Sequence, residues 1–161
     1  MNLKWILTSF EGRMRRRDYW LGFVAMIVLS IVLSIGLSLV LGAELGGILG
    51  TLILLYPAAA LLTKRMHDRE KGANPWLLVF LGIPMLANLM AAGGIGFEAV
   101  PSLDGGPGGM LPSNAIGYVV SLAAVVVGLW GLVEFGFLRG TRGPNRFRPD
   151  PVPGATQALA T

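Results

Sequence analysis

The chain has 161 residues, of which 53% are hydrophobic, and a formal net charge of +4 at pH 7. Its mean hydropathy of +0.65 is far above that of ordinary soluble domains, which predicts a membrane protein. Because the sequence contains no cysteine, disulfides, thiolate metal sites and cysteine nucleophiles are all excluded.

The N-terminal segment NLKWILTSF predicts an amphipathic helix at the membrane interface. Apolar residues recur at i, i+3, i+4 and i+7, in Leu3, Ile6, Leu7 and Phe10, and Gly12 can end the helix. We therefore assign residues 1–12 to an interfacial amphipathic helix. The alternative is an unstructured N-terminus with chance periodicity.

Four apolar runs follow, each close to the about 20 residues that cross a hydrocarbon core as an α-helix. They cover residues 20–41, 45–62, 75–92 and 116–138. In lipid only a helix satisfies its own backbone groups, so the predicted fold class is all-α, an integral membrane four-helix bundle within residues 13–150. A cleaved signal peptide is the competing interpretation of the first run, but its apolar stretch is too long, and we favour a signal anchor.

Small residues recur at four-residue spacing in the first two runs, at Ser30, Ser34 and Ser38 and at Gly42, Gly46 and Gly50. Such stripes let helices approach closely, either within one bundle or across a dimer face. The sequence leaves both interpretations open.

Two further segments are predicted to lie outside the helices. The connection over residues 93–115 is rich in glycine and proline and long for a compact domain, so we expect it to be flexible, external and dispensable for folding. Residues 151–161 lack the apolar periodicity needed to fold, which predicts a disordered C-terminal tail.

The cationic residues all fall on one side of the predicted membrane. The thirteen are Lys4, Arg13, Arg15, Arg16 and Arg17 before the first run, Lys64, Arg65, Arg69 and Lys71 between the second and third, and Arg139, Arg142, Arg146 and Arg148 after the fourth. The opposite connections carry only Glu44, Glu98 and Asp104. The positive-inside rule therefore predicts cytoplasmic termini and a cytoplasmic 63–74 loop. It also accounts for a pI near 10 without a nucleic-acid partner.

Three polar segments then meet at the cytoplasmic end: FEGRMRRRDYW, KRMHDREKG and RGTRGPNRFRPDP. We predict that they form a polar rim, whose candidate site residues are Arg13, Arg15, Arg16, Lys64, Arg65, His67, Asp68, Glu134, Asn145, Arg146 and Asp150. We expect Asp68 to accept bonds from Arg13 or Arg15, and His67 to donate to a nearby carbonyl or carboxylate. Glu134 either reaches interfacial water or turns inward to bind Lys64 or Arg65.

These segments resemble the signatures of the DUF805 family of small bacterial inner-membrane proteins. The pattern F-x-G-R-x-R-R-x-x-Y-W is met by Phe10, Gly12, Arg13, Arg15, Arg16, Tyr19 and Trp20, and the basic-R-L-H-D run by Lys64, Arg65, His67 and Asp68 with Met66 for leucine. The pattern G-T-x-G-x-N-R-[YF]-G-P-D-P is met by Gly140, Thr141, Gly143, Asn145, Arg146, Phe147, Pro149, Asp150 and Pro151, with Arg148 for its glycine. The resemblance implies a bacterial inner (plasma) membrane location and no known biochemical activity.

The sequence offers little catalytic chemistry. It has no G-x-S-x-G elbow, P-loop or H-E-x-x-H motif. His67 and Asp68 are adjacent, so on a helix their side chains diverge by about 100° and cannot form a relay. We expect no enzyme activity, metal or cofactor; the less favoured alternative is a catalytic site around His67 and Asp68.

Two functional classes fit these features. The favoured one is a non-enzymatic scaffold, or a component that binds anionic lipid headgroups or a membrane-protein partner through the basic rim. The alternative is a small transporter or pore subunit that acts as a homo-oligomer. A transporter needs a polar path, for which the spans offer only Asn88, Glu134 and a few serines and threonines.

The topology is testable with a reporter fused after Thr161. Each cation costs about 2.5–3.5 kcal/mol at a helix centre and resists translocation in short loops, so a C-terminal green fluorescent protein should fluoresce while an alkaline phosphatase fusion stays inactive. The converse pattern would place the C-terminus outside and separate the three polar segments.

Overall fold

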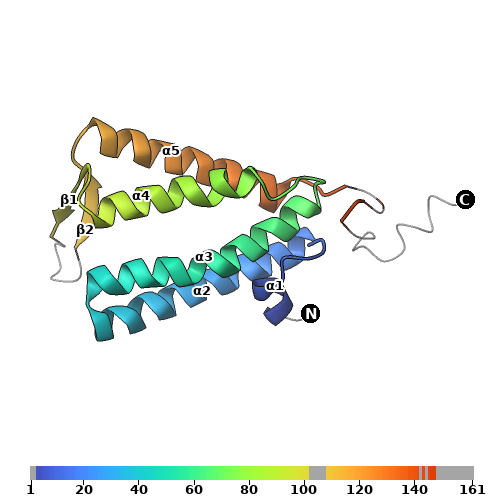
Figure 1. Cartoon of the computed structure of the whole chain (residues 1–161), viewed down its shortest axis with the longest axis horizontal. Helices are drawn as coiled ribbons and strands as arrows, with labels where there is room; N and C mark the ends of the chain where they lie inside the picture. The colour runs from blue at the N-terminus through green and yellow to red at the C-terminus, as the bar shows by residue number, and fades with distance from the viewer. Residues whose placement is uncertain (1–2, 102–107, 142, 144, 148–161) are drawn as a thin grey trace, which may run out of the picture.

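The computed structural model describes residues 3–101, 108–141, 143 and 145–147. Within these residues the chain is mostly helical, with a small sheet (Figure 1). The elements in chain order are α1 (Leu3–Thr8), α2 (Arg16–Leu41), α3 (Ala43–His67), the π-helical η1 (Leu78–Gly82), α4 (Ile83–Ala92), β1 (Phe97–Val100), β2 (Gly109–Pro112), α5 (Ala115–Gly131) and the π-helical η2 (Leu132–Phe137). The predicted tail over 151–161 lies outside the described residues.

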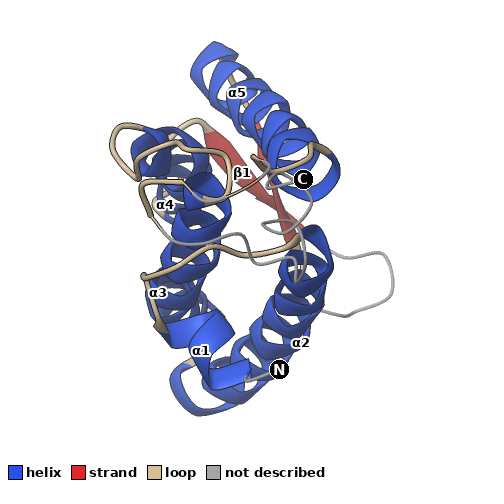
Figure 2. Ribbon diagram, turned by 90° about the vertical axis from the view of Figure 1, so that its right-hand side faces the viewer, coloured by secondary structure: helices blue, strands red, loops and turns tan. Residues whose placement is uncertain are grey.

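The long helices form two hairpins, α2 with α3 and α4 with α5, as Figures 1 and 2 show. The turn of the first hairpin is Gly42, whose φ of +82° favours glycine. Close packing follows at Gly46, where a Cβ would lie 2.7 Å from the carbonyl carbon of Leu37. At this position the stripe of small residues serves packing within the chain.

Three of the described helices are long and apolar enough to cross a membrane: Arg16–Leu41, Leu45–His67 and Ala115–Phe137. The predicted run over 75–92 gives the shorter apolar helix Leu78–Ala92. Their outer faces are strongly apolar, and Leu39 and Val40 near the end of α2 are 82% and 80% exposed. Such surfaces suit lipid rather than water.

In its described residues, the connection between α4 and α5 forms a small sheet that the sequence did not predict. Strands β1 and β2 pair antiparallel from Phe97 opposite Pro112 to Val100 opposite Gly109, so the all-α assignment missed a two-stranded sheet. The sheet packs on the helix ends: Ser113 N–H donates to the carbonyl of Gly96 at 2.9 Å, and Asn114 caps α5. The strands were missed because each has only four residues and lacks clear apolar alternation.

The buried core gathers where the hairpins converge. Its members are Ile6, Met14, Tyr19, Leu61, Met66, Phe80, Val127 and Phe135. Helix α1 contributes the fully buried Ile6 and ends at Thr8, before the predicted boundary at residue 12. Gly22 makes this docking possible, because a Cβ there would lie 2.6 Å from Leu61 and 2.8 Å from Ile6.

The contact between sheet and helix predicts opposite effects for two glycine substitutions in α5. Gly117→Ala should lower the unfolding free energy by about 1–3 kcal/mol, because its Cβ would collide with the carbonyl oxygen of Gly96. Gly128→Ala is the matched control, with open space around its Cβ, and should be neutral or gain up to about 1 kcal/mol. Thermal unfolding in detergent measures both. Equal behaviour of the two variants would mean that the sheet does not rest on α5.

Candidate functional site

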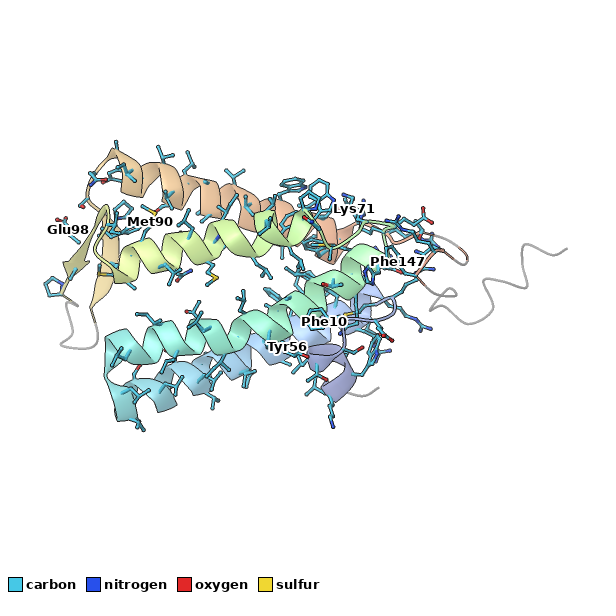
Figure 3. All side chains as sticks on the ribbon, in the orientation of Figure 1. Phe10, Tyr56, Lys71, Met90, Glu98 and Phe147 are labelled. Atoms are coloured by element: carbon cyan, nitrogen blue, oxygen red, sulfur yellow. The ribbon has the colours of Figure 1, made fainter. Side chains whose placement is uncertain are left out.

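The three polar segments meet at the end of the structure where the hairpins converge, with Lys71 and Phe147 at that end and Glu98 at the other (Figure 3). This cluster is the polar rim predicted from sequence. The structure places all its candidate residues there except Asp150, which lies outside the described residues.

The carboxylate of Asp68, at the C-cap of α3, is the centre of the rim. One oxygen accepts from Arg13, with Nε at 3.1 Å and Nη2 at 3.0 Å, and the other from Arg65 Nη1 at 2.6 Å. Side-chain exposure is only 6% for Asp68, 1% for Arg13 and 0% for Arg65. The expected Arg13 partner is thus confirmed. Arg65 joins it one helical turn before Asp68, a spacing that could have indicated the pair.

Backbone carbonyls satisfy the remaining donors of the two arginines. Arg65 donates to Phe135 and Leu138 at 2.6 Å each and to Met14 at 3.2 Å. Arg13 donates to the carbonyls of Thr141 and Gly143, each at 2.7 Å. The two guanidinium groups therefore join the end of α3 to the segment before α2, the end of η2 and the chain after it. These carbonyl partners could not be predicted, because no residue type or motif indicates where a backbone carbonyl points.

The segment after η2 folds over the end of α3. Thr141 N–H and Oγ1 both donate to the carbonyl of Asp68, at 2.8 Å and 3.0 Å, and Asn145 Nδ2 donates to the carbonyl of His67 at 2.9 Å. These bonds satisfy carbonyls that the last helical turn leaves open. Gly140 must lack a side chain, because a Cβ there would collide with the Asp68 carboxylate.

His67 has different neighbours from Asp68. Its Nδ1 lies 3.2 Å from the carbonyl oxygen of Gly12, as expected for donation to a carbonyl. Its ring stacks on Phe147 with centroids 3.9 Å apart and an interplanar angle of 11°. The geometry is that of a cap holding the chain after η2 against α3.

Lys64 fixes helix α1. Its Nζ donates to the carbonyls of Trp5 at 2.9 Å, Ile6 at 2.8 Å and Ser9, and lies 4.9 Å from the Trp5 ring centroid. The fully buried ammonium group thus supplies hydrogen-bond donors to carbonyls at the end of a short helix, where intrahelical N–H partners run out. In the sequence, the position of Lys64 at the end of an apolar run is the one feature that indicates a contact between this lysine and the chain.

Glu134 is buried and paired, but not with the predicted partners. Its Oε1 accepts from Lys71 Nζ at 2.7 Å and lies 2.8 Å from Arg69 Nε, whose N–H is not aligned for a hydrogen bond. Lys64 binds backbone carbonyls, and Arg65 binds Asp68 and backbone carbonyls, so the predicted pairing is wrong. The alternative of a water-exposed carboxylate is also wrong, because Glu134 is only 5% exposed. The ion pair instead ties η2 to the turn after α3.

Residues 7–149 match the family described as "Protein of unknown function (DUF805)". The chain belongs to the DUF805 family. It is similar to "Uncharacterized protein YiiR" of Escherichia coli strain K12 and to the protein of the same name from O157:H7, each 28% identical over 155 residues that cover 93% of this chain and 90% of the relative. No solved structure matches the chain. The family resemblance inferred from the three motifs is confirmed.

In this DUF805 chain a second group of cations lies outside the buried cluster. Arg16 and Arg146 are exposed and reach backbone carbonyls, Arg16 that of Phe137 and Arg146 that of Glu70, at 3.1 Å each. Arg15 and Arg17 line a surface pocket of about 420 Å³ together with Asp18 and Leu21. Among the described residues, no three histidine, aspartate or glutamate side chains come together as metal ligands.

The Asp68 carboxylate predicts a large effect of one isosteric change. Asp68→Asn leaves two buried guanidinium groups without their counter-charge and should cost about 3–5 kcal/mol of unfolding free energy, measured by denaturation in detergent. The double variant Arg13→Gln with Asp68→Asn should cost less than the sum of the singles. Asp18→Asn, a partly exposed aspartate in the first turn of α2, is the control and should cost at most about 1 kcal/mol. Equal losses at Asp68 and Asp18 would contradict a structural centre at Asp68.

Proposed function

We propose that this DUF805 chain is a non-enzymatic multi-pass protein of the bacterial inner membrane, with both termini and the polar rim in the cytoplasm. In this proposal four helices cross the membrane. The outward cations of the rim bind anionic lipid headgroups, and the same surface serves as a scaffold for a membrane-protein partner.

A membrane crossing by the predicted run over 75–92, in addition to the three long helices, is supported by the continuity of α4 with the segment before it. Helical backbone runs from Trp76 through η1 to Ala92, which is about 25 Å at 1.5 Å per residue. This approaches the roughly 30 Å hydrocarbon thickness. A crossing here also keeps the 63–74 loop and the C-terminal arginines on one side.

The observation that carries the headgroup proposal is the division of the rim cations into two groups. Arg13, Lys64 and Arg65 are buried and engaged within the chain. The run Arg15–Arg17 at the start of α2 faces outward, with Arg16 and Arg17 exposed. Clustered cations at a cytoplasmic surface each add about 1 kcal/mol of attraction to acidic lipid, and the positive end of the α2 dipole adds to that field.

The transporter alternative has weaker support. The rim end of the bundle is filled by aromatic contacts, with Phe80 4.7 Å from Phe135 and 4.9 Å from Trp130 between ring centroids. Asn88 donates to the carbonyl of Pro84 in its own helix at 2.9 Å. The aromatic contacts close the rim end of the bundle, and Asn88 is engaged within its own helix, so both features disfavour a polar path.

The headgroup proposal predicts lipid selectivity with opposite signs in two variants. In phosphatidylcholine vesicles, spin-labelled phosphatidylglycerol should associate with the chain more strongly than spin-labelled phosphatidylcholine. Removing two cations in Arg15→Gln with Arg17→Gln should lower that preference, by up to about fivefold per charge. Asp18→Asn in the same pocket should raise it, and high salt should weaken it because exposed charges are screened. Unchanged selectivity in both variants would remove the headgroup role.

A further inference from the structure

A large cleft separates the two helical hairpins at the end away from the rim. Its volume is about 1460 Å³, and it is lined by α2, α3, α4 and the sheet. Figure 1 shows the two hairpins apart in this half of the structure, with the sheet at its end. The lining includes Ser34, Gly47, Thr51, Asn88 and Ala99.

The cleft offers few polar contacts to a ligand. Ser30, Thr51 and Asn88 donate to carbonyls of their own helices, Ile27 at 2.7 Å, Gly47 at 2.9 Å and Pro84 at 2.9 Å. None of the described lining residues carries a formal charge, and most are glycine, alanine, leucine or isoleucine. A polar solute would therefore lose its hydrogen bonds to water without gaining new ones in the cleft, whereas a hydrocarbon chain has no such bonds to lose.

The depth of the cleft matches one leaflet of a bilayer. Along α3 its lining runs from Gly46 to Leu54, which is about 12 Å at 1.5 Å per residue. Half of a roughly 30 Å hydrocarbon core is about 15 Å. A transmembrane helix from another chain would need a groove of the full thickness, but the other half of this chain is closed by the core around Phe80 and Phe135.

Charge at the open end selects among lipids. Ala99 on β1 and its partner Met110 on β2 line the cleft, and the exposed Glu98, one residue before Ala99, lies on the opposite face of the strand, at the outer end of the molecule. The sequence places only acidic charges in the connections at this end, and every cation at the other. An ammonium group is therefore favoured here and an anionic headgroup is not.

We propose that this cleft binds acyl chains of a phospholipid from the non-cytoplasmic leaflet, with an ammonium-bearing headgroup of the phosphatidylethanolamine class at the acidic end of the molecule that carries Glu98. The site rests on the proposed topology, because only that topology opens the cleft to this leaflet. It is distinct from the rim, where the charge preference is reversed.

The test uses the full chain, which has no native cysteine. A bimane fluorophore is attached at Ala91→Cys in the cleft, or at Val125→Cys on the exposed face of α5 as control. The chain is reconstituted in phosphatidylcholine vesicles with increasing phosphatidylethanolamine that carries a doxyl quencher on its acyl chain. Quenching at Ala91→Cys should saturate and be reversed by unlabelled phosphatidylethanolamine, whereas quenching at Val125→Cys should rise steadily.

Two glycine-to-leucine substitutions distinguish a cleft filled by the new side chain from a general defect in the folded chain. Gly47 and Gly36 both lie in long helices, and at each of them a Cβ would point into open space, but only Gly47 lines the cleft. Gly47→Leu should reduce the saturable quenching severalfold, and Gly36→Leu should leave it unchanged. Glu98→Gln should lower the preference for phosphatidylethanolamine over phosphatidylglycerol.

Several outcomes overturn the proposal. Steady, non-saturating quenching at Ala91→Cys would show that the cleft holds no specific lipid. Saturation by phosphatidylglycerol as strong as by phosphatidylethanolamine would remove the headgroup selectivity. A dimer that Gly47→Leu dissociates would make a second copy the occupant.

Failure of the topology is recognised separately. A membrane-impermeant thiol reagent should label Leu111→Cys, exposed on β2, from outside intact cells. Labelling from outside without saturable quenching rejects the lipid site alone. Labelling only after the membrane is opened rejects the topology.

Discussion

The structure depends on one buried carboxylate held between two buried guanidinium groups. Asp68 lies at the end of α3, and Arg13 and Arg65 connect it to the segment before α2, the end of η2 and the chain that follows. Taking three charges out of water is costly, and the cost is met only when every donor and acceptor is satisfied. The backbone carbonyls that complete the two arginines are therefore as necessary as the ion pairs themselves.

This constraint makes the molecule asymmetric along its length. At the rim, the core residues, the aromatic contacts and the buried charges draw both hairpins together. At the opposite end the short sheet packs on α4 and α5, and a cleft of about 1460 Å³ lies between the two hairpins. Buried charge fixes which carbonyls must meet, so the rim sets the register of the two hairpins.

The helices and the rim could be predicted because their signals are long and repetitive. Apolar runs indicate helices over 20–41 and 116–138, and the segregated cations bring the three polar segments to one end. Arg13 as a partner of Asp68 followed from charge and proximity. The rest depends on backbone direction: the carbonyls that bind Lys64, the pairing of Glu134 with Lys71, and the two four-residue strands have no pattern in the residues themselves.

The division of the cations shows why charge counts alone do not describe such a surface. The positive-inside rule treats Arg13, Arg17 and Lys64 alike, since each resists translocation equally. In the folded chain Lys64 donates to a carbonyl of α1 and Arg13 donates to Asp68, whereas Arg17 stays exposed. Buried cations resist screening by salt and hold the fold, and exposed cations respond to salt and can meet a headgroup. Cations therefore serve two different purposes in the folded chain: the buried ones hold the rim together, and the exposed ones are available for the proposed headgroup contact.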